Sequence, residues 1–61
     1  TNLKPVPAAF VPKSIADYVK KNYPEAFVSK IDRESRGYDV ELSNHMDLKF
    51  DANGNFLRFD D

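Results

Sequence analysis

The stretch that decides the fold is residues 12–42, PKSIADYVKKNYPEAFVSKIDRESRGYDVEL. Before Pro24, apolar side chains recur every three or four positions, which is the spacing of one helix face. After Pro24 they alternate with polar side chains, which indicates strands buried on one side. Proline disfavours the helical conformation of the preceding residue and lacks an amide hydrogen. The sequence therefore predicts a helix from about Pro12 to Asn22 or Tyr23, followed by strands.

The predicted helix carries one apolar and aromatic face. Its members are Ile15, Tyr18, Val19, Asn22 and Tyr23. Lys20 and Lys21 fall in the last turn, where positive charge opposes the helix dipole. A face of this kind usually packs on a core, so we expect it to bury against the sheet.

The strands after the helix are separated by short turns. These turns are residues 35–37 (SRG), 43–46 (SNHM) and 51–54 (DANG). Asn44 and His45 would form the centre of a two-residue type I′ turn, with strain at His45 because glycine is the usual second residue. Short turns favour pairing between strands that are adjacent in the sequence. The predicted fold class is therefore α+β, with one main helix packed on a four-stranded antiparallel meander.

The first strand interrupts its own alternation. Strict alternation places Val28 with Lys30 and Asp32 on the polar face, opposite Ile31. Val28 and Ile31 are both apolar, however, and a β-bulge near Ser29 would explain this pair.

One helix can cover only one face of the sheet, so the other face is open. In the last strand we expect Leu57 and Phe59 to face the helix and Phe56 to face outward. The open face is the candidate protein-binding face. Its predicted members are Lys30, Asp39, Glu41, Asp47, Lys49, Phe56 and Arg58.

Composition limits the classes of function. The chain has 61 residues and no cysteine, so it forms one domain with a small core that disulfides cannot support. Nine Lys and Arg residues against ten Asp and Glu leave no basic stripe for nucleic acid. No apolar stretch approaches the length of a membrane span. Tight packing, a repeat neighbour or a second chain is left to support so small a core.

The chain divides into an extended arm, residues 1–11, and an α+β domain, residues 12–61. Pro5 and Pro7 favour extended or turn backbone in the arm. Residues 7–10 could form one helical turn, and the apolar residues Leu3, Val6 and Phe10 suggest that part of the arm lies on the core.

Nothing in the sequence predicts catalysis or a cofactor. His45 has only Ser43 close by, and neighbours on a turn rarely form a working pair. Residues 51–55 (DANGN) share an aspartate and a glycine with calcium loops, but the glycine stands at position four rather than six and no glutamate follows. A β-turn accounts for this segment better, and zinc lacks ligands. We expect no metal, no cofactor and no enzyme activity.

Three segments together resemble a known family. They are Ile15–Pro24 (IADYVKKNYP), Gly37–Leu42 (GYDVEL) and Phe50–Asn55 (FDANGN). From about Pro12 onward the chain resembles the PepSY-like, β-lactamase-inhibitor-like domains found in exported proteins of gut Bacteroidetes. It departs from them at His45, where the family's hairpin has glycine.

The resemblance implies a helix on a four-stranded sheet, export to the periplasm or cell surface, and a binding or inhibitory role. Family members often carry two such units, and this chain holds one. The leading hypothesis is a non-catalytic module that uses the open sheet face to bind an unidentified protein partner and to inhibit a secreted or periplasmic enzyme. The alternative is a repeat unit or self-association domain without a separate ligand.

Overall fold

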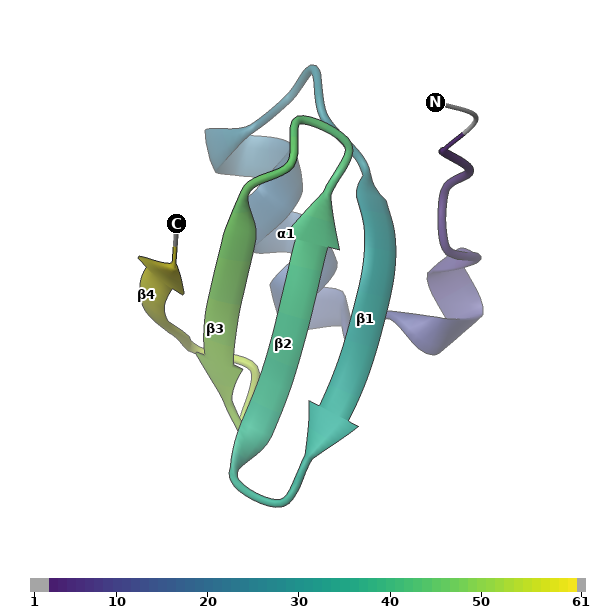
Figure 1. Ribbon diagram of the computed structural model, residues 1–61. Coiled ribbons are helices and arrows are strands. Elements are labelled where there is room, and N and C mark those ends of the chain that lie inside the picture. Colours follow the sequence, from purple (N-terminus) through teal and green to yellow (C-terminus); the bar gives the residue numbers. More distant parts are fainter. Residues whose placement is uncertain (1–2, 61) are drawn as a thin grey trace.

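The computed structural model describes residues 3–60, with the backbone alone for Asp60. Its elements are a short 3-10 helix η1 (Ala8–Phe10), the helix α1 (Lys13–Asn22), and the strands β1 (Val28–Glu34), β2 (Gly37–Leu42), β3 (Asp47–Asp51) and β4 (Phe56–Asp60). The strands lie in the order β1-β2-β3-β4, each antiparallel to the next. The predicted fold class is confirmed, and α1 lies behind the sheet in Figure 1.

The prolines delimit α1 as the sequence indicates. Pro12 adopts an extended conformation (φ −54°, ψ 143°) and its carbonyl oxygen accepts the Ala16 N–H at 3.0 Å, so the helix begins one residue later. At the other end the Tyr23 N–H donates to the Val19 carbonyl oxygen at 2.7 Å, and Pro24 follows. No helix in residues 3–60 is long and apolar enough to cross a membrane.

The core forms where α1 meets the sheet. Ile15 and Val19 of α1 are 0% and 4% exposed. The buried apolar side chains from the sheet are Val28, Val40, Leu42, Leu48 and Phe50. Burial of each such side chain stabilises the fold by about 1.5–3 kcal/mol relative to exposure. Asn22, expected on the same helix face, is exposed and its side-chain amide donates to the Tyr18 carbonyl oxygen at 3.0 Å.

A β-bulge interrupts the register of β1. Val28 lies opposite Leu42 and Lys30 lies opposite Glu41, which leaves Ser29 as the extra residue. The predicted bulge near Ser29 is therefore confirmed. It turns Val28 into the core rather than onto the polar face.

A second bulge interrupts β4. Phe50 lies opposite Phe56 while the preceding residue, Lys49, lies opposite Arg58, so Leu57 is the extra residue. An extra residue shifts every later side chain of the strand by one position. The alternation within 56–59 therefore differs from a regular strand.

The bulge overturns part of the expected orientation of β4. Phe56 packs against the core, and its ring stacks on that of Tyr18 with centroids 4.7 Å apart and planes 10° apart. The prediction that Phe56 faces outward was wrong, as was the burial of Leu57, which is 58% exposed. Phe59 lies opposite buried Leu48, on the expected side, but it is 56% exposed.

The arm lies beside the first half of β1. The Val6 N–H donates to the Val28 carbonyl oxygen at 2.8 Å, and Val6 and Val11 pack against the core. The expected helical turn is η1. Phe10, which ends it, is 70% exposed and does not bury.

Leu42 and Met46 close the β2–β3 hairpin, so its loop contains three residues, 43–45, rather than the predicted two. The Leu42 N–H donates to the Met46 carbonyl oxygen and the His45 N–H donates to the Leu42 carbonyl oxygen, both at 2.9 Å. The last loop residue, His45, takes φ 70°, the left-handed conformation that usually belongs to glycine at this position. The prediction of a two-residue type I′ turn was wrong, but His45 does take the positive φ on which the expected strain depends.

The β3–β4 loop has the same geometry with glycine in place of histidine. The Asp51 N–H donates to the Asn55 carbonyl oxygen at 2.8 Å, and Gly54 takes φ 83°. Gly54 is buried, and a Cβ there would collide with the Ser14 hydroxyl at the start of α1. His45 is exposed, so only backbone strain opposes a side chain at that position.

We therefore expect Gly54→Ala to lower the free energy of unfolding by about 1–3 kcal/mol, from backbone strain and the collision together. The matched variant His45→Gly should raise it by less than about 1 kcal/mol, because relief of strain is offset by unfolded-state entropy. Urea unfolding measures both. Adding Ser14→Ala to Gly54→Ala should recover only part of the loss; full recovery would show that backbone strain is unimportant.

Candidate protein-binding face

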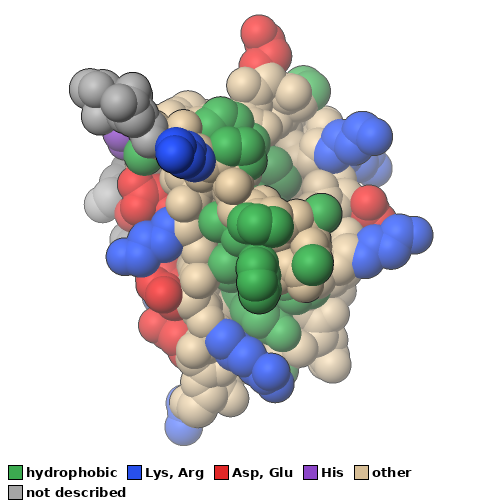
Figure 2. All heavy atoms as spheres, turned by 90° about the vertical axis from the view of Figure 1, so that its right-hand side faces the viewer, with side chains coloured by type: hydrophobic (Ala, Val, Ile, Leu, Met, Phe, Trp, Pro, Cys, Tyr) green, Lys and Arg blue, Asp and Glu red, His purple; other side chains and the backbone are tan. Residues whose placement is uncertain are grey.

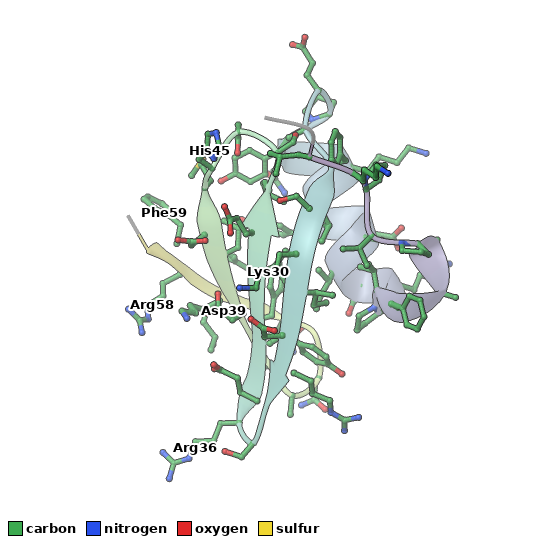
Figure 3. All side chains as sticks on the ribbon, turned by 45° about the vertical axis from the view of Figure 1, so that its right-hand side comes forward. Lys30, Arg36, Asp39, His45, Arg58 and Phe59 are labelled. Atoms are coloured by element: carbon green, nitrogen blue, oxygen red, sulfur yellow. The ribbon has the colours of Figure 1, made fainter. Side chains whose placement is uncertain are left out.

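The side of the sheet away from α1 carries charged side chains from all four strands. We call these residues the polar sheet face: Lys30, Asp32, Asp39, Glu41, Asp47, Lys49 and Arg58. In Figure 3, Lys30 and Asp39 project from the centre of this side, whereas Arg58 points away at its margin. Phe56, predicted as a member, belongs to the core.

Six of the seven residues line one small depression of about 160 Å³. They are Lys30, Asp32, Asp39, Glu41, Asp47 and Lys49. The sequence analysis listed five of these residues as members of the candidate face. It also placed Asp32 on the polar side of its strand but did not list it as a candidate. Its strict alternation in a predicted strand was the signal that could have included it.

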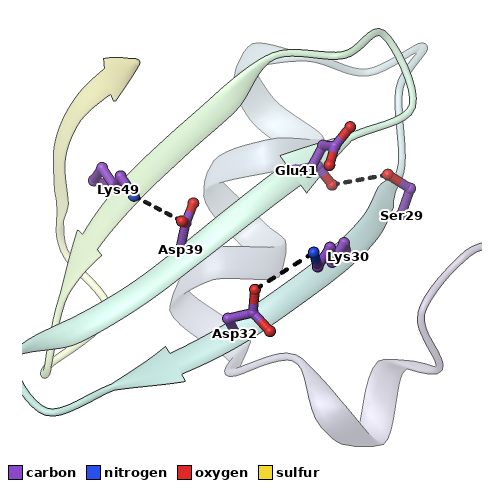
Figure 4. Close-up of polar contacts among 6 residues, drawn as sticks. All are labelled: Ser29, Lys30, Asp32, Asp39, Glu41 and Lys49. Atoms are coloured by element: carbon purple, nitrogen blue, oxygen red, sulfur yellow. Dashed lines mark hydrogen bonds and ion pairs between the residues drawn. The ribbon is translucent and has the colours of Figure 1, made fainter. Parts of the chain in front are cut away.

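The strongest contact on this face joins neighbouring strands. The Lys49 ammonium donates to Asp39 Oδ2 at 2.7 Å, from side chains that are 23% and 31% exposed (Figure 4). A second pair on β1, Lys30 Nζ with Asp32 Oδ2, is longer at 3.9 Å and mostly exposed. The half-buried pair therefore fixes the centre of the face, while the second pair remains loose.

Like charges face one another around this central pair. Asp32 lies opposite Asp39, and Glu41 lies opposite Asp47. His45 Nδ1 lies 4.0 Å from Glu41 Oε2, so a protonated His45 would partly offset that carboxylate. Asp47 forms no hydrogen bond or ion pair with any side chain described in the structure. Like charges directly opposite in a sheet oppose folding.

The residues considered for catalysis do not form a site. The Ser43 hydroxyl oxygen accepts the Phe27 N–H at 3.0 Å, while His45 points to solvent with 79% of its side chain exposed. The Ser43 hydroxyl thus fixes the loop to the start of β1. His45 lies beside the Glu41 carboxylate, and it makes no hydrogen bond with Ser43.

Asp51 organises the turn that resembled a calcium loop. Its Oδ1 accepts the N–H of Asn55 at 2.8 Å and that of Asn53 at 2.9 Å. The Asn55 N–H, and after it the Asn55 side chain and the Asn53 and Gly54 amides, hold the pKa of the Asp51 carboxyl below its usual range. Within residues 3–60 no group of acidic, histidine or cysteine side chains could hold a metal ion. The segment is a β-turn stabilised by its own aspartate.

The sequence profile of the PepSY-like family, described as beta-lactamase-inhibitor-like, matches residues 1–58. The chain belongs to the PepSY-like family. Among proteins with curated descriptions, none matches this PepSY-like chain.

Three solved structures are similar to this PepSY-like domain. One, from Bacteroides vulgatus, is inferred to be a periplasmic protein and has unknown function; it shares 38% identity with a TM-score of 0.92 over 98% of the chain. Another, inferred to be a calcium-regulated periplasmic protein from Bacteroides thetaiotaomicron, shares 45% identity with a TM-score of 0.89 over 95% of the chain. A second inferred periplasmic protein from Bacteroides vulgatus shares 43% identity with a TM-score of 0.87 over 95% of the chain.

The PepSY-like chain spans less than half the length of these proteins. It covers 48% of the first and 46% of each of the others. Sequence identities of 38–45% indicate relatedness in sequence as well as in fold. The periplasmic descriptions of these proteins agree with the localisation that the resemblance implied.

The lowered pKa of Asp51 predicts a pH-dependent contribution to stability. A carboxyl whose pKa is lower in the folded state stabilises the fold fully above its unfolded pKa and progressively less as pH falls through the folded pKa. We expect Asp51→Ala to lower the free energy of unfolding at pH 7, and this difference from wild type to shrink below about pH 4.

Urea unfolding between about pH 7 and pH 3 measures this difference. Asp51→Asn is the matched control, because it keeps an oxygen acceptor for the turn amides without the charge. It should lose less stability than Asp51→Ala at pH 7. If the wild-type and Asp51→Ala proteins stay equally far apart throughout, the carboxylate charge has no part in the turn.

Proposed function

We propose that this domain is a non-catalytic protein-binding module that works in the periplasm, and that the polar sheet face receives its partner. The observation that carries the proposal is the opposed carboxylates, Asp32 with Asp39 and Glu41 with Asp47. The isolated fold gains nothing from these pairs. A partner that offers lysine or arginine side chains would neutralise them.

The geometry of the face suits a protein surface rather than a small molecule. The depression is small and lined by charged side chains, whereas small-molecule sites are larger and mostly apolar. Lys49 and Asp39 form a fixed centre at 2.7 Å, and the more exposed charges surround it. Charges arranged in this way speed encounter with a complementary surface and select among partners.

We propose further that the partner is a secreted or periplasmic enzyme and that binding inhibits it. The support is the family's description as beta-lactamase-inhibitor-like together with the periplasmic descriptions of similar structures. The proposal of a non-catalytic domain rests on the contacts of Ser43 and His45. The Ser43 hydroxyl oxygen accepts the Phe27 N–H, and His45 lies beside Glu41, so no base activates the Ser43 hydroxyl as a nucleophile.

Replacing Asp47 should have opposite effects on the stability of the domain and on partner binding. We expect Asp47→Asn to raise the free energy of unfolding by about 0.2–1 kcal/mol, because it removes the repulsion with Glu41. The same change should reduce capture of a partner from periplasmic extract by the immobilised domain, measured by quantitative mass spectrometry. Because Asp47→Asn should be more stable than wild type, unfolding of the variant cannot explain the reduced capture.

Asp17→Asn is the matched control, since Asp17 is exposed on α1 and lies off the sheet. It should leave the captured proteins unchanged. Equal capture by wild type, Asp47→Asn and Glu41→Gln would place the binding surface elsewhere.

A second candidate function is self-association or packing on a repeat neighbour. It is favoured by the exposed apolar side chains of the edge strand β4, with Leu57 58% and Phe59 56% exposed. An exposed edge strand readily pairs with another chain. The similar structures, each about twice as long as this chain, have room for such a neighbour.

If β4 mediates association, Phe59→Ser should shift the chain toward monomer in sedimentation at about 100 μM, because it removes apolar area from the contact. Phe10→Ser removes a phenylalanine that is 70% exposed at the opposite edge, and it serves as the control. If the wild-type chain sediments as a monomer at this concentration, association of identical copies is excluded.

A further inference from the structure

The N-terminal arm exposes an unbroken run of apolar residues. Residues 5–12 (PVPAAFVP) contain no polar side chain, and residues 7–10 are all exposed. Phe10 is 70% exposed, more than Leu57 (58%) or Phe59 (56%) on β4. In Figure 1, η1 projects beyond the edge of β1 and carries this ring outward. Exposed apolar surface that is gathered in one place marks an interaction site.

Two hollows extend this apolar surface on either side of the arm. One, of about 730 Å³, lies between the arm and β1, with Phe10, Val11 and Ile31 in its lining. The other, of about 250 Å³, lies between the arm and α1, with Ala8, Val11 and Ala16 in its lining. Val11 belongs to both, so the apolar surface is continuous from β1 across the arm to α1.

Cations surround this apolar surface. Lys4 and Lys13, both exposed, flank the apolar run in the sequence. Arg33 lines the first hollow beside Phe10, and Lys20 lines the second. In Figure 2, which views this side of the molecule, hydrophobic side chains gather at the centre with Lys and Arg side chains around them. None of the four cations forms an ion pair with another residue in the range 3–60.

Few carboxylates oppose these cations. Residues 1–16 contain no Asp or Glu, and Asp17, between the two lysines of α1, offsets part of their charge. Lys30 also lines the first hollow, but it lies on the polar sheet face beside Asp32 and its charge is directed there. An apolar centre with a cationic margin complements the headgroup region of an anionic bilayer.

We propose that this arm surface, formed by residues 5–12 with Lys4, Lys13, Lys20 and Arg33, docks the domain on an anionic phospholipid bilayer. Phe10 and its apolar neighbours enter the headgroup region, while the cations contact lipid phosphates. Lysine side chains at the margin lay their methylene groups along the apolar surface and keep their ammonium groups at the phosphates.

Docking in this way leaves the polar sheet face accessible. The arm lies beyond the edge of β1, whereas the polar sheet face is the broad side of the sheet away from α1 (Figure 1). A protein partner on that face and a bilayer under the arm would not compete for the same residues. Each proposal can therefore fail without the other.

Sedimentation of the chain with sucrose-loaded vesicles measures the docking. We expect binding to phosphatidylcholine vesicles that contain about 30% phosphatidylglycerol, and loss of this binding as NaCl rises from about 0.05 M to about 0.5 M. Phe10→Ser should weaken the binding at least about tenfold, because the apolar ring is lost. Lys13→Gln should weaken it about fivefold, and Asp17→Asn should strengthen it by a similar factor.

Matched changes on β4 serve as controls. Phe59→Ser and Arg58→Gln alter exposed side chains at the opposite edge of the sheet, and both should bind vesicles like wild type. The chain has no tryptophan, so Phe10→Trp introduces a single fluorescent reporter. Its emission should shift to shorter wavelength on binding to the anionic vesicles, whereas that of Phe59→Trp should stay unchanged.

Three outcomes would overturn the proposal. Equal binding to vesicles with and without phosphatidylglycerol would remove the role of the cations. Wild-type affinity in Phe10→Ser would remove the apolar contact. Absence of vesicle binding, together with loss of self-association or of protein capture in Phe10→Ser, would assign the arm surface to a second copy or to a protein partner.

Discussion

The contact on which the rest of the structure depends is the packing of α1 on one face of the sheet. Ile15 and Val19 lie in one buried cluster with the inward side chains of the sheet. One helix covers one face, so the opposite face must be polar to remain in water. The polar sheet face is thus a direct consequence of the helix, and the proposed binding there would use a surface that folding already requires.

The sequence predicted the elements that depend on periodicity. The change of period at Pro24 identified α1 and the strands, and the regular alternation from Tyr38 to Leu42 placed Asp39 and Glu41 on the open face. These predictions succeeded because central strands, paired on both sides, keep strict alternation. Most of the candidate face could be listed for this reason.

The edge strands were harder to predict, because each contains a bulge. Ser29 in β1 and Leu57 in β4 are extra residues that shift the strand by one position. The apolar pair Val28 and Ile31, which breaks strict alternation, signalled the first bulge. In β4, however, Phe56, Leu57 and Phe59 are all large and apolar, so the pattern could not decide which one faces the helix. Stacking of Phe56 on Tyr18 decides it, and that contact joins segments far apart in the sequence.

The meander also determines the order in which the molecule can assemble. Each strand pairs with its sequence neighbour through a short loop, so every hairpin closes with little loss of chain entropy and on a microsecond timescale. The contact of Gly54 with Ser14 is different, because it joins the last hairpin to the beginning of the helix across most of the chain. Docking of α1, rather than strand pairing, should therefore be the slow step that sets the folding rate.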